Sequence, residues 1–222
     1  VYGHSSKVTC MILTDALFWK ILRETGCVDE TRGMEFHEFS AGASRLVTFS
    51  KTHSYGEYIF DWAWADAYQR SGVPYYPKLT SMVPFTPATA PHFLGPQSDW
   101  PSLLRQHDEL LKTHSSAHFL FTTPEEQKFL GENGYLLRDS FQYHFFNEGY
   151  GSFDDFLGTL RPKKAKHIRK ERLFPDLTIE RLSGRALTES HASEMYAFYL
   201  MTIEEKGAIP YLTKTFFERL FT

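Results

Sequence analysis

The alternation of helical and strand-like segments is the feature that most constrains how this chain can fold. Apolar residues at helical spacing, framed by cap residues, alternate with short apolar runs that end at turn residues. We predict helices over residues 14–23, 61–70, 99–111, 123–134, 152–160, 161–172, 188–205 and from residue 213 onward. We predict strands over residues 45–49, 78–85, 117–122, 135–146 and 177–182. Together these segments predict a mixed α/β (α+β) fold.

Segment 147–152, which is rich in Gly and polar residues, is the best candidate for a domain boundary. A nearly complete α/β unit lies before it, so residues 1–150 are predicted to form a first domain. Residues 151–222 are predicted to begin a second domain. Because roughly 70 residues with two or three elements make a poor core of their own, we expect this second domain to be incomplete.

Composition excludes several classes of protein. The 222 residues are 42% hydrophobic and 23% charged, which is ordinary for a globular protein and excludes disordered and collagen-like chains. No stretch approaches the ~18 apolar residues of a membrane span. Cys10 and Cys27 are too few for a disulfide scaffold or a thiolate zinc site. Since the first residues lack the pattern of a secretory signal, we expect a cytoplasmic location.

Aromatic and acidic residues are concentrated in residues 54–91. They are Tyr55, Tyr58, Phe60, Trp62, Trp64, Tyr68, Tyr75, Tyr76 and Phe85, with Glu57, Asp61 and Asp66 between them. Carboxylates walled by rings lose solvent, which raises their pKa and suits them to take a proton near neutral pH. Tyr and Trp offer a substrate a flat apolar surface with one polar group. The segment as a whole therefore predicts the lining of a cleft, although a place in the core is the commoner role for any single ring.

Residues 161–172, RPKKAKHIRKER, concentrate positive charge in a chain whose net charge is −3. They hold seven Lys or Arg and one acid, Glu171, which gives a local charge of +6. One interpretation is a solvated helix that keeps the protein in solution. The other is a site for the phosphates of RNA, a nucleotide-linked substrate or coenzyme A. Its candidate anion-binding residues are Lys163, Lys164, Lys166, Arg169, Lys170 and Arg172.

Other catalytic patterns are missing from the sequence. It contains no H-E-x-x-H, P-loop, G-x-G-x-x-G or G-x-S-x-G motif. His114 and His118 have the spacing of a helical metal pair, but they have no evident third ligand, so no metal is expected.

The segments SYGEYIFDWAWADAY, YYPKL and VPFTPATAP resemble those of the bacterial FemAB-like N-acyltransferases, a family associated with peptidoglycan biosynthesis or recognition. FFNEGYGSFDDFLGTL, IRKER and FYLMTIEEKGAIPYLTKTFF are similar as well. The resemblance runs from about residue 14 to residue 222. KKAKH, at 163–167, departs from the more arginine-rich sequence of the family.

The resemblance implies two GNAT-type acyltransferase domains in tandem, the first nearly complete and the second truncated. It implies transfer of an acyl or aminoacyl group from acyl-CoA or aminoacyl-tRNA to an amine. The acceptor would be a small molecule or peptide, such as a peptidoglycan precursor, and tRNA would be a partner. The CoA-binding pattern Q/R-x-x-G-x-G/A is absent, and TPATAPHFLGP stands in its place. We therefore expect the first domain to bind the acceptor.

Within this interpretation, Asp61 or Asp66 is predicted to be the base or the anchor of the amine, and Tyr76 is a further catalytic candidate. The predicted substrate-binding residues are Tyr55, Glu57, Trp62, Trp64, Tyr75 and Lys78. We expect both carboxylates and the basic stretch 161–172 to border one cavity. The alternative is a non-catalytic, acyltransferase-like module that binds RNA or a phosphate-bearing cell-wall precursor through 161–172.

Overall fold

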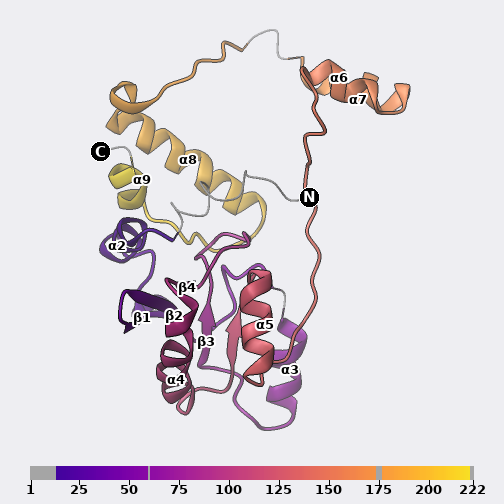
Figure 1. Cartoon of the computed structure of the whole chain (residues 1–222). Helices are drawn as coiled ribbons and strands as arrows, with labels where there is room; N and C mark the ends of the chain where they lie inside the picture. The colour runs from indigo at the N-terminus through magenta and orange to yellow at the C-terminus, as the bar shows by residue number, and fades with distance from the viewer. Residues whose placement is uncertain (1–13, 60, 174–176, 221–222) are drawn as a thin grey trace. The chain divides into compact units, whose positions relative to one another are not determined.

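Antiparallel and parallel strands combine in one mixed sheet in the larger of two units (Figure 1). The first unit is Val1–Leu137 with Leu187–Thr222, and the second is Arg138–Ala186. The computed structural model describes residues 14–59, 61–173 and 177–220. The mixed α/β class is confirmed, and the domain boundary near residue 150 stays a prediction.

The sheet is built around β2, whose neighbours are both close and distant in sequence. Its strands are β1 (Met34–Ala41), β2 (Ser44–Lys51), β3 (Lys78–Ser81), β4 (Phe93–Leu94) and β5 (Ala117–Phe119). The order is β1-β2-β3-β5, with β4 also paired to β2. Only the β3–β5 pairing among these strands is parallel. A two-residue turn joins β1 to β2, and Gly42 supplies the positive φ that such a turn needs.

Helices cover both faces of this sheet. The first unit contains α2 (Ala16–Glu24), α3 (Trp62–Arg70), α4 (Trp100–Leu111), α5 (Pro124–Glu132), α8 (Glu189–Glu205) and α9 (Lys214–Leu220). Short 3-10 helices are η1 (Glu30–Arg32), η2 (Gln97–Asp99) and, in the second unit, η3 (Gly184–Ala186). No helix in the described part of the chain is both long and apolar enough to cross a bilayer.

The core is divided by the sheet, because successive side chains of β2 point to opposite faces. Val47 and Phe49 pack in one cluster with residues of α2, α8 and α9. Leu46 packs in the other with residues of α4 and α5. The two clusters hold the sheet rigidly between helices, so the ends of β2 and β3 are fixed points for a site.

The second unit is a helical hairpin of α6 (Phe153–Gly158) and α7 (Pro162–Glu171). Leu157 and Ala165 are its buried residues on the two helices. Asp154 pairs with Arg169 at 3.0 Å. The predicted helix over 161–172 is thus confirmed.

Two predicted strands are wrong. Residues 135–146 and 177–182 have no regular secondary structure, although their composition favours strands. Tyr143 is 96% exposed, and no strand in the described part of the chain pairs with residues 135–146, so they have neither the neighbouring strand nor the packed face that stabilise a strand. Conversely, β1 and β4 were not predicted, and the strand predicted over 78–85 ends at Ser81.

Candidate functional site

Two lysines lie side by side at the ends of β2 and β3. Lys51 ends β2, Lys78 begins β3, and the two are register partners in the sheet. Both are fully buried, at 0% exposure. Two buried like charges on adjacent strands destabilise a sheet unless acids compensate them. The segment that follows β2 supplies those acids, Glu57 and Asp61, each 2% exposed.

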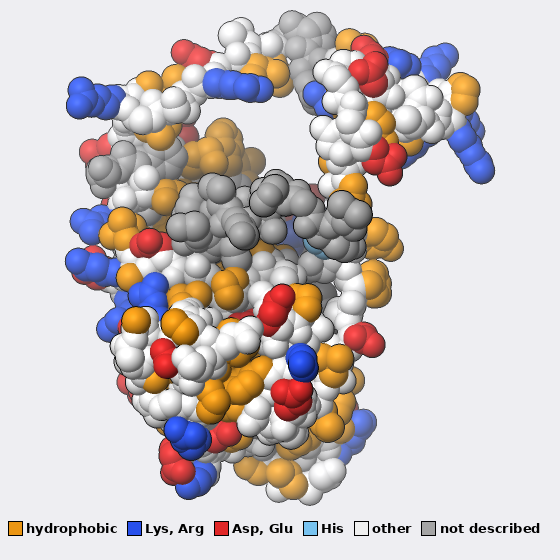
Figure 2. All heavy atoms as spheres, in the orientation of Figure 1, with side chains coloured by type: hydrophobic (Ala, Val, Ile, Leu, Met, Phe, Trp, Pro, Cys, Tyr) orange, Lys and Arg blue, Asp and Glu red, His pale blue; other side chains and the backbone are white. Residues whose placement is uncertain are grey.

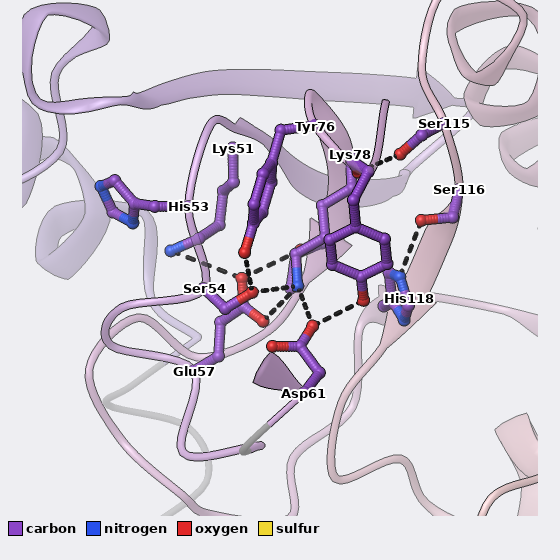
Figure 3. A network of polar contacts seen from close by, with 12 residues as sticks. Lys51, His53, Ser54, Glu57, Asp61, Tyr76, Lys78, Ser115, Ser116 and His118 are labelled. Atoms are coloured by element: carbon purple, nitrogen blue, oxygen red, sulfur yellow. Dashed lines mark hydrogen bonds and ion pairs between the residues drawn. The ribbon is translucent and has the colours of Figure 1, made fainter. Parts of the chain in front are cut away.

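Lys78 is the centre of this buried cluster, which we define as Lys51, Ser54, Glu57, Asp61 and Lys78 (Figure 3). Its Nζ donates to Ser54 Oγ at 2.7 Å, to Glu57 Oε2 at 2.8 Å and to Asp61 Oδ2 at 2.6 Å. Lys51 Nζ lies 3.6 Å from Glu57 Oε1. The two positive and two negative charges therefore balance within the cluster.

Two tyrosines that precede β3 close one side of the buried cluster. The Tyr75 hydroxyl donates to Asp61 Oδ2 at 2.6 Å, and the Tyr76 hydroxyl lies 2.9 Å from Ser54 Oγ. Lys78 Nζ is 5.3 Å from the Tyr75 ring and 5.8 Å from the Tyr76 ring. Both rings thus lie against the cluster, and the Tyr75 hydroxyl fixes the Asp61 carboxylate while the Tyr76 hydroxyl fixes Ser54.

The cluster controls the protonation of its members. Burial alone would raise the pKa of Asp61, but hydrogen bonds from Lys78 and Tyr75 outweigh it and lower that pKa below its usual value. Burial lowers the pKa of Lys51 to about 8, against the attraction of Glu57. Burial, and then Asp61, raise the pKa of Tyr75. The expectation of a raised carboxyl pKa is therefore wrong for Asp61, because a lysine lies between the acids.

One oxygen of Asp61 is unused. Oδ2 accepts bonds from Lys78 and Tyr75, whereas buried Oδ1 has no hydrogen-bond partner among the described residues. Figure 3 shows dashed lines to one oxygen of Asp61 and none to the other. A buried acceptor without a donor costs about 1–3 kcal/mol, and such atoms are uncommon in folded proteins. This oxygen therefore keeps an acceptor position that no described donor fills.

Asp66 does not belong to the cluster. It lies on α3 with its side chain 58% exposed and pairs with Arg70 at 3.0 Å. The expectation that both carboxylates border one cavity is corrected here, because Asp61 precedes the helix and points inward, whereas Asp66 faces solvent.

The exposed aromatic residues lie close to the cluster in sequence. Tyr55 is 41%, Tyr58 46%, Trp62 45% and Trp64 53% exposed. The rings of Tyr55 and Trp62 are 5.3 Å apart. Trp64 is two positions further along α3, on a different face from Trp62. Phe60 and Cys10 are outside the described residues.

The structure thus brings five of the sequence-predicted residues together in one candidate site, and these are Glu57, Asp61, Tyr75, Tyr76 and Lys78. Sequence reasoning missed Lys51 and Ser54. Nothing in the local sequence marks Lys51, since its burial follows from its pairing with a strand 27 positions further on. Ser54 lies directly before the aromatic motif and was a weak signal.

Helix α7 contrasts with this cluster. Its lysines project into solvent, and Figure 2 shows the blue side chains that extend from this part of the molecule. Arg169 pairs with Asp154, and the Arg172 guanidinium lies 4.0 Å from the centre of the Phe153 ring. No ion pair joins the remaining lysines to any described residue, and these are Lys163, Lys164, Lys166 and Lys170. A cavity shared by α7 and the buried cluster stays a prediction.

Side chains that commonly bind metals do not gather within the described ranges. No three His, Cys, Asp or Glu side chains there have an arrangement that could hold a metal ion.

Comparison with known proteins identifies the family. The chain belongs to the FemAB_like family, described as peptidoglycan biosynthesis/recognition, whose profile matches residues 9–222. Neither the curated proteins nor the solved structures contain a match. The resemblance seen in the sequence is therefore confirmed at the level of the family.

Proposed function

We propose that this chain transfers an acyl or aminoacyl group to an amine of a peptidoglycan precursor, and that Asp61 holds this amine. The observation that carries the proposal is the free Oδ1 of a carboxylate that is 2% exposed. The description of the family, peptidoglycan biosynthesis/recognition, supports a peptidoglycan precursor as the acceptor.

The ionised state of the Asp61 carboxylate suits it to hold the amine of the acceptor in place. Because its pKa is lowered, the carboxylate is ionised at neutral pH and attracts an ammonium group. The same lowered pKa makes it a weak base, so its contribution is orientation more than proton abstraction. Lys78 keeps the carboxylate ionised, and Tyr75 fixes Oδ2 so that Oδ1 remains for the acceptor.

The chemical step needs little covalent work from the protein. The ammonium group releases one proton to water, its neutral nitrogen attacks the donor carbonyl, and a C–N bond forms as the nitrogen gives up a second proton. The C–S bond of an acyl-CoA or the ester C–O bond of an aminoacyl-tRNA breaks, and the departing thiolate or alkoxide takes up a proton. Both donors are molecules of the cytoplasm, and this proposal places the reaction there.

The fold proposed with this function is the tandem GNAT arrangement. Residues 1–150 would form the domain that binds the acceptor, and residues 151–222 would begin the second. The sheet covered by helices on both faces supports a mixed α/β transferase fold.

The test is a transfer assay with Asp61→Asn and Asp66→Asn. The full chain is incubated with a nucleotide-linked muropeptide and acetyl-CoA or aminoacyl-tRNA, and the amide product is measured by mass spectrometry. We expect Asp61→Asn to lower kcat/KM about 100-fold or more while circular dichroism stays native. Glu109→Gln, at an exposed ion pair on α4, is the matched surface control. Loss of transfer in Asp66→Asn alone would refute the role of Asp61.

A second candidate function rests on α7. Its four lysines without ion pairs among the described residues favour a module that binds phosphates of RNA or of a cell-wall precursor without chemistry. Calorimetric titration with tRNA, acetyl-CoA and a nucleotide-linked muropeptide distinguishes the two. The second candidate predicts tight binding that weakens steeply with salt and no product.

A further inference from the structure

Two aromatic rings remain exposed beside the buried cluster. The rings of Tyr55 and Trp62 lie 5.3 Å apart and are tilted by 55°. The His53 ring lies 5.2 Å from that of Tyr55 and extends the row. Large rings left in water without apolar cover mark a surface used for recognition when they are adjacent. We name Tyr55 and Trp62 the aromatic platform.

The platform is held in place by the buried cluster. Lys51 Nζ donates to the Tyr55 carbonyl at 2.7 Å, and the Tyr55 N–H donates to His53 Nδ1 at 3.2 Å. Trp62 is the first residue of α3 and follows Asp61, which Lys78 and Tyr75 fix. Since both rings are attached to anchored backbone, a ligand meets a surface that needs little ordering.

The size of the platform limits what can cover it. A stable protein interface buries about 800 Å² on each partner, far more than two rings supply. Among the described residues next to the platform in sequence, Thr52, Ala63 and Asp66 are exposed and small or polar, so they do not widen the apolar surface of the two rings. The platform therefore fits a small ligand.

The chemistry of the rings indicates the ligand class. Each presents a flat apolar face with a hydroxyl or indole N–H at its edge. The four charged side chains of the buried cluster balance one another, so no net charge beneath the two rings favours an ionic group on the platform itself. A pyranose ring has the matching features, namely an apolar C–H face and hydroxyl groups at its rim.

We infer that Tyr55 and Trp62 bind the N-acetylhexosamine ring of the acceptor by stacking against its apolar face. The inference rests on the proposed function and names the part of the substrate that this site recognises. Because Trp62 follows Asp61 directly, a sugar on the platform holds the rest of the acceptor beside the carboxylate.

Saturation-transfer NMR on the full chain tests the inference without any need for turnover. The probes are N-acetylglucosamine, N-acetylmuramyl dipeptide and the dipeptide without its sugar. We expect saturation of the sugar C–H protons, and a dissociation constant about fivefold or more larger in Trp62→Ala and in Tyr55→Ala. Trp62→Phe should retain most of the affinity. Phe198→Ala, which removes an exposed ring on α8, should bind as the unaltered chain does.

The outcomes separate this inference from the proposed function. Sugar binding that depends on Trp62 supports the platform even when no transfer product forms, in which case only the proposed function fails. Equal affinity in Trp62→Ala and Phe198→Ala overturns the inference. Binding of the free dipeptide as tight as that of the muramyl dipeptide overturns it as well, because the rings would then recognise peptide.

Discussion

The buried cluster and helix α7 hold positive charge in opposite ways. In the cluster, Lys51 and Lys78 are fully buried and balanced by Glu57 and Asp61. On α7, Lys163 and Lys166 are exposed and have no ion pair with the described residues. Charge that is buried and paired fixes geometry and protonation, whereas exposed charge acts at a distance and is screened by salt. The two regions should therefore respond to different experiments.

The largest effect is expected where one partner of the buried cluster is removed. Lys78→Met leaves the two buried acids, Glu57 and Asp61, with Lys51 as the remaining buried lysine of the cluster. Because one buried negative charge is then uncompensated, the free energy of unfolding should fall by about 3–5 kcal/mol. Urea denaturation followed by circular dichroism measures it. Arg70→Met breaks only an exposed ion pair and should change the free energy of unfolding by less than about 0.5 kcal/mol. Equal effects in the two variants would mean that the cluster is not a buried ion network.

A smaller, pH-dependent effect should come from Lys51. Its pKa is about 8 in the folded chain and near 10.5 when unfolded, so between these values the unfolded chain binds the extra proton. Stability therefore rises with pH in this window. From about pH 8 to about pH 10 the unaltered chain should gain on the order of 2 kcal/mol relative to Lys51→Met. Parallel urea series at several pH values measure the difference, and a constant difference would contradict the lowered pKa.

The smallest effect on stability is expected on α7. Replacing Lys163, Lys164, Lys166 and Lys170 together by Gln should change the free energy of unfolding by less than about 0.5 kcal/mol, since these side chains are solvated. Affinity for tRNA should fall, and the slope of log affinity against log salt should become shallower by about 0.7 for each phosphate that the variant no longer neutralises. Filter binding with tRNA over a series of salt concentrations measures both the affinity and the slope. If the slope of log affinity against log salt is unchanged, the lysines of α7 do not bind the phosphates of tRNA.

The same contrast explains what the sequence could predict. The positive charge of α7 is visible in twelve consecutive residues, and helix ends carry local signals. Thr123 and Glu126 form the capping box expected of them, and α5 begins there. Local chemistry suffices for such features because their partners are three or four residues away.

Strands and burial depend on distant partners and were harder to predict. The aromatic segment 135–146 looks like a strand but has no partner strand among the described residues. Five of the residues that the structure brings together were named from the sequence, and their role as a site stays a prediction; they are Glu57, Asp61, Tyr75, Tyr76 and Lys78. Lys51 was missed because only its register with Lys78 makes it a buried residue, and Asp66 was included because helical spacing does not say which face is covered.

A thermodynamic cycle tests whether Asp61 Oδ1 binds the acceptor amine, as we propose. Calorimetry would compare a muropeptide with a free amine and the same muropeptide with that amine acetylated, on the unaltered chain and on Asp61→Asn. We expect the unaltered chain to prefer the free amine by about tenfold or more and Asp61→Asn to lose this preference. An equal preference in both chains would show that the amine binds elsewhere.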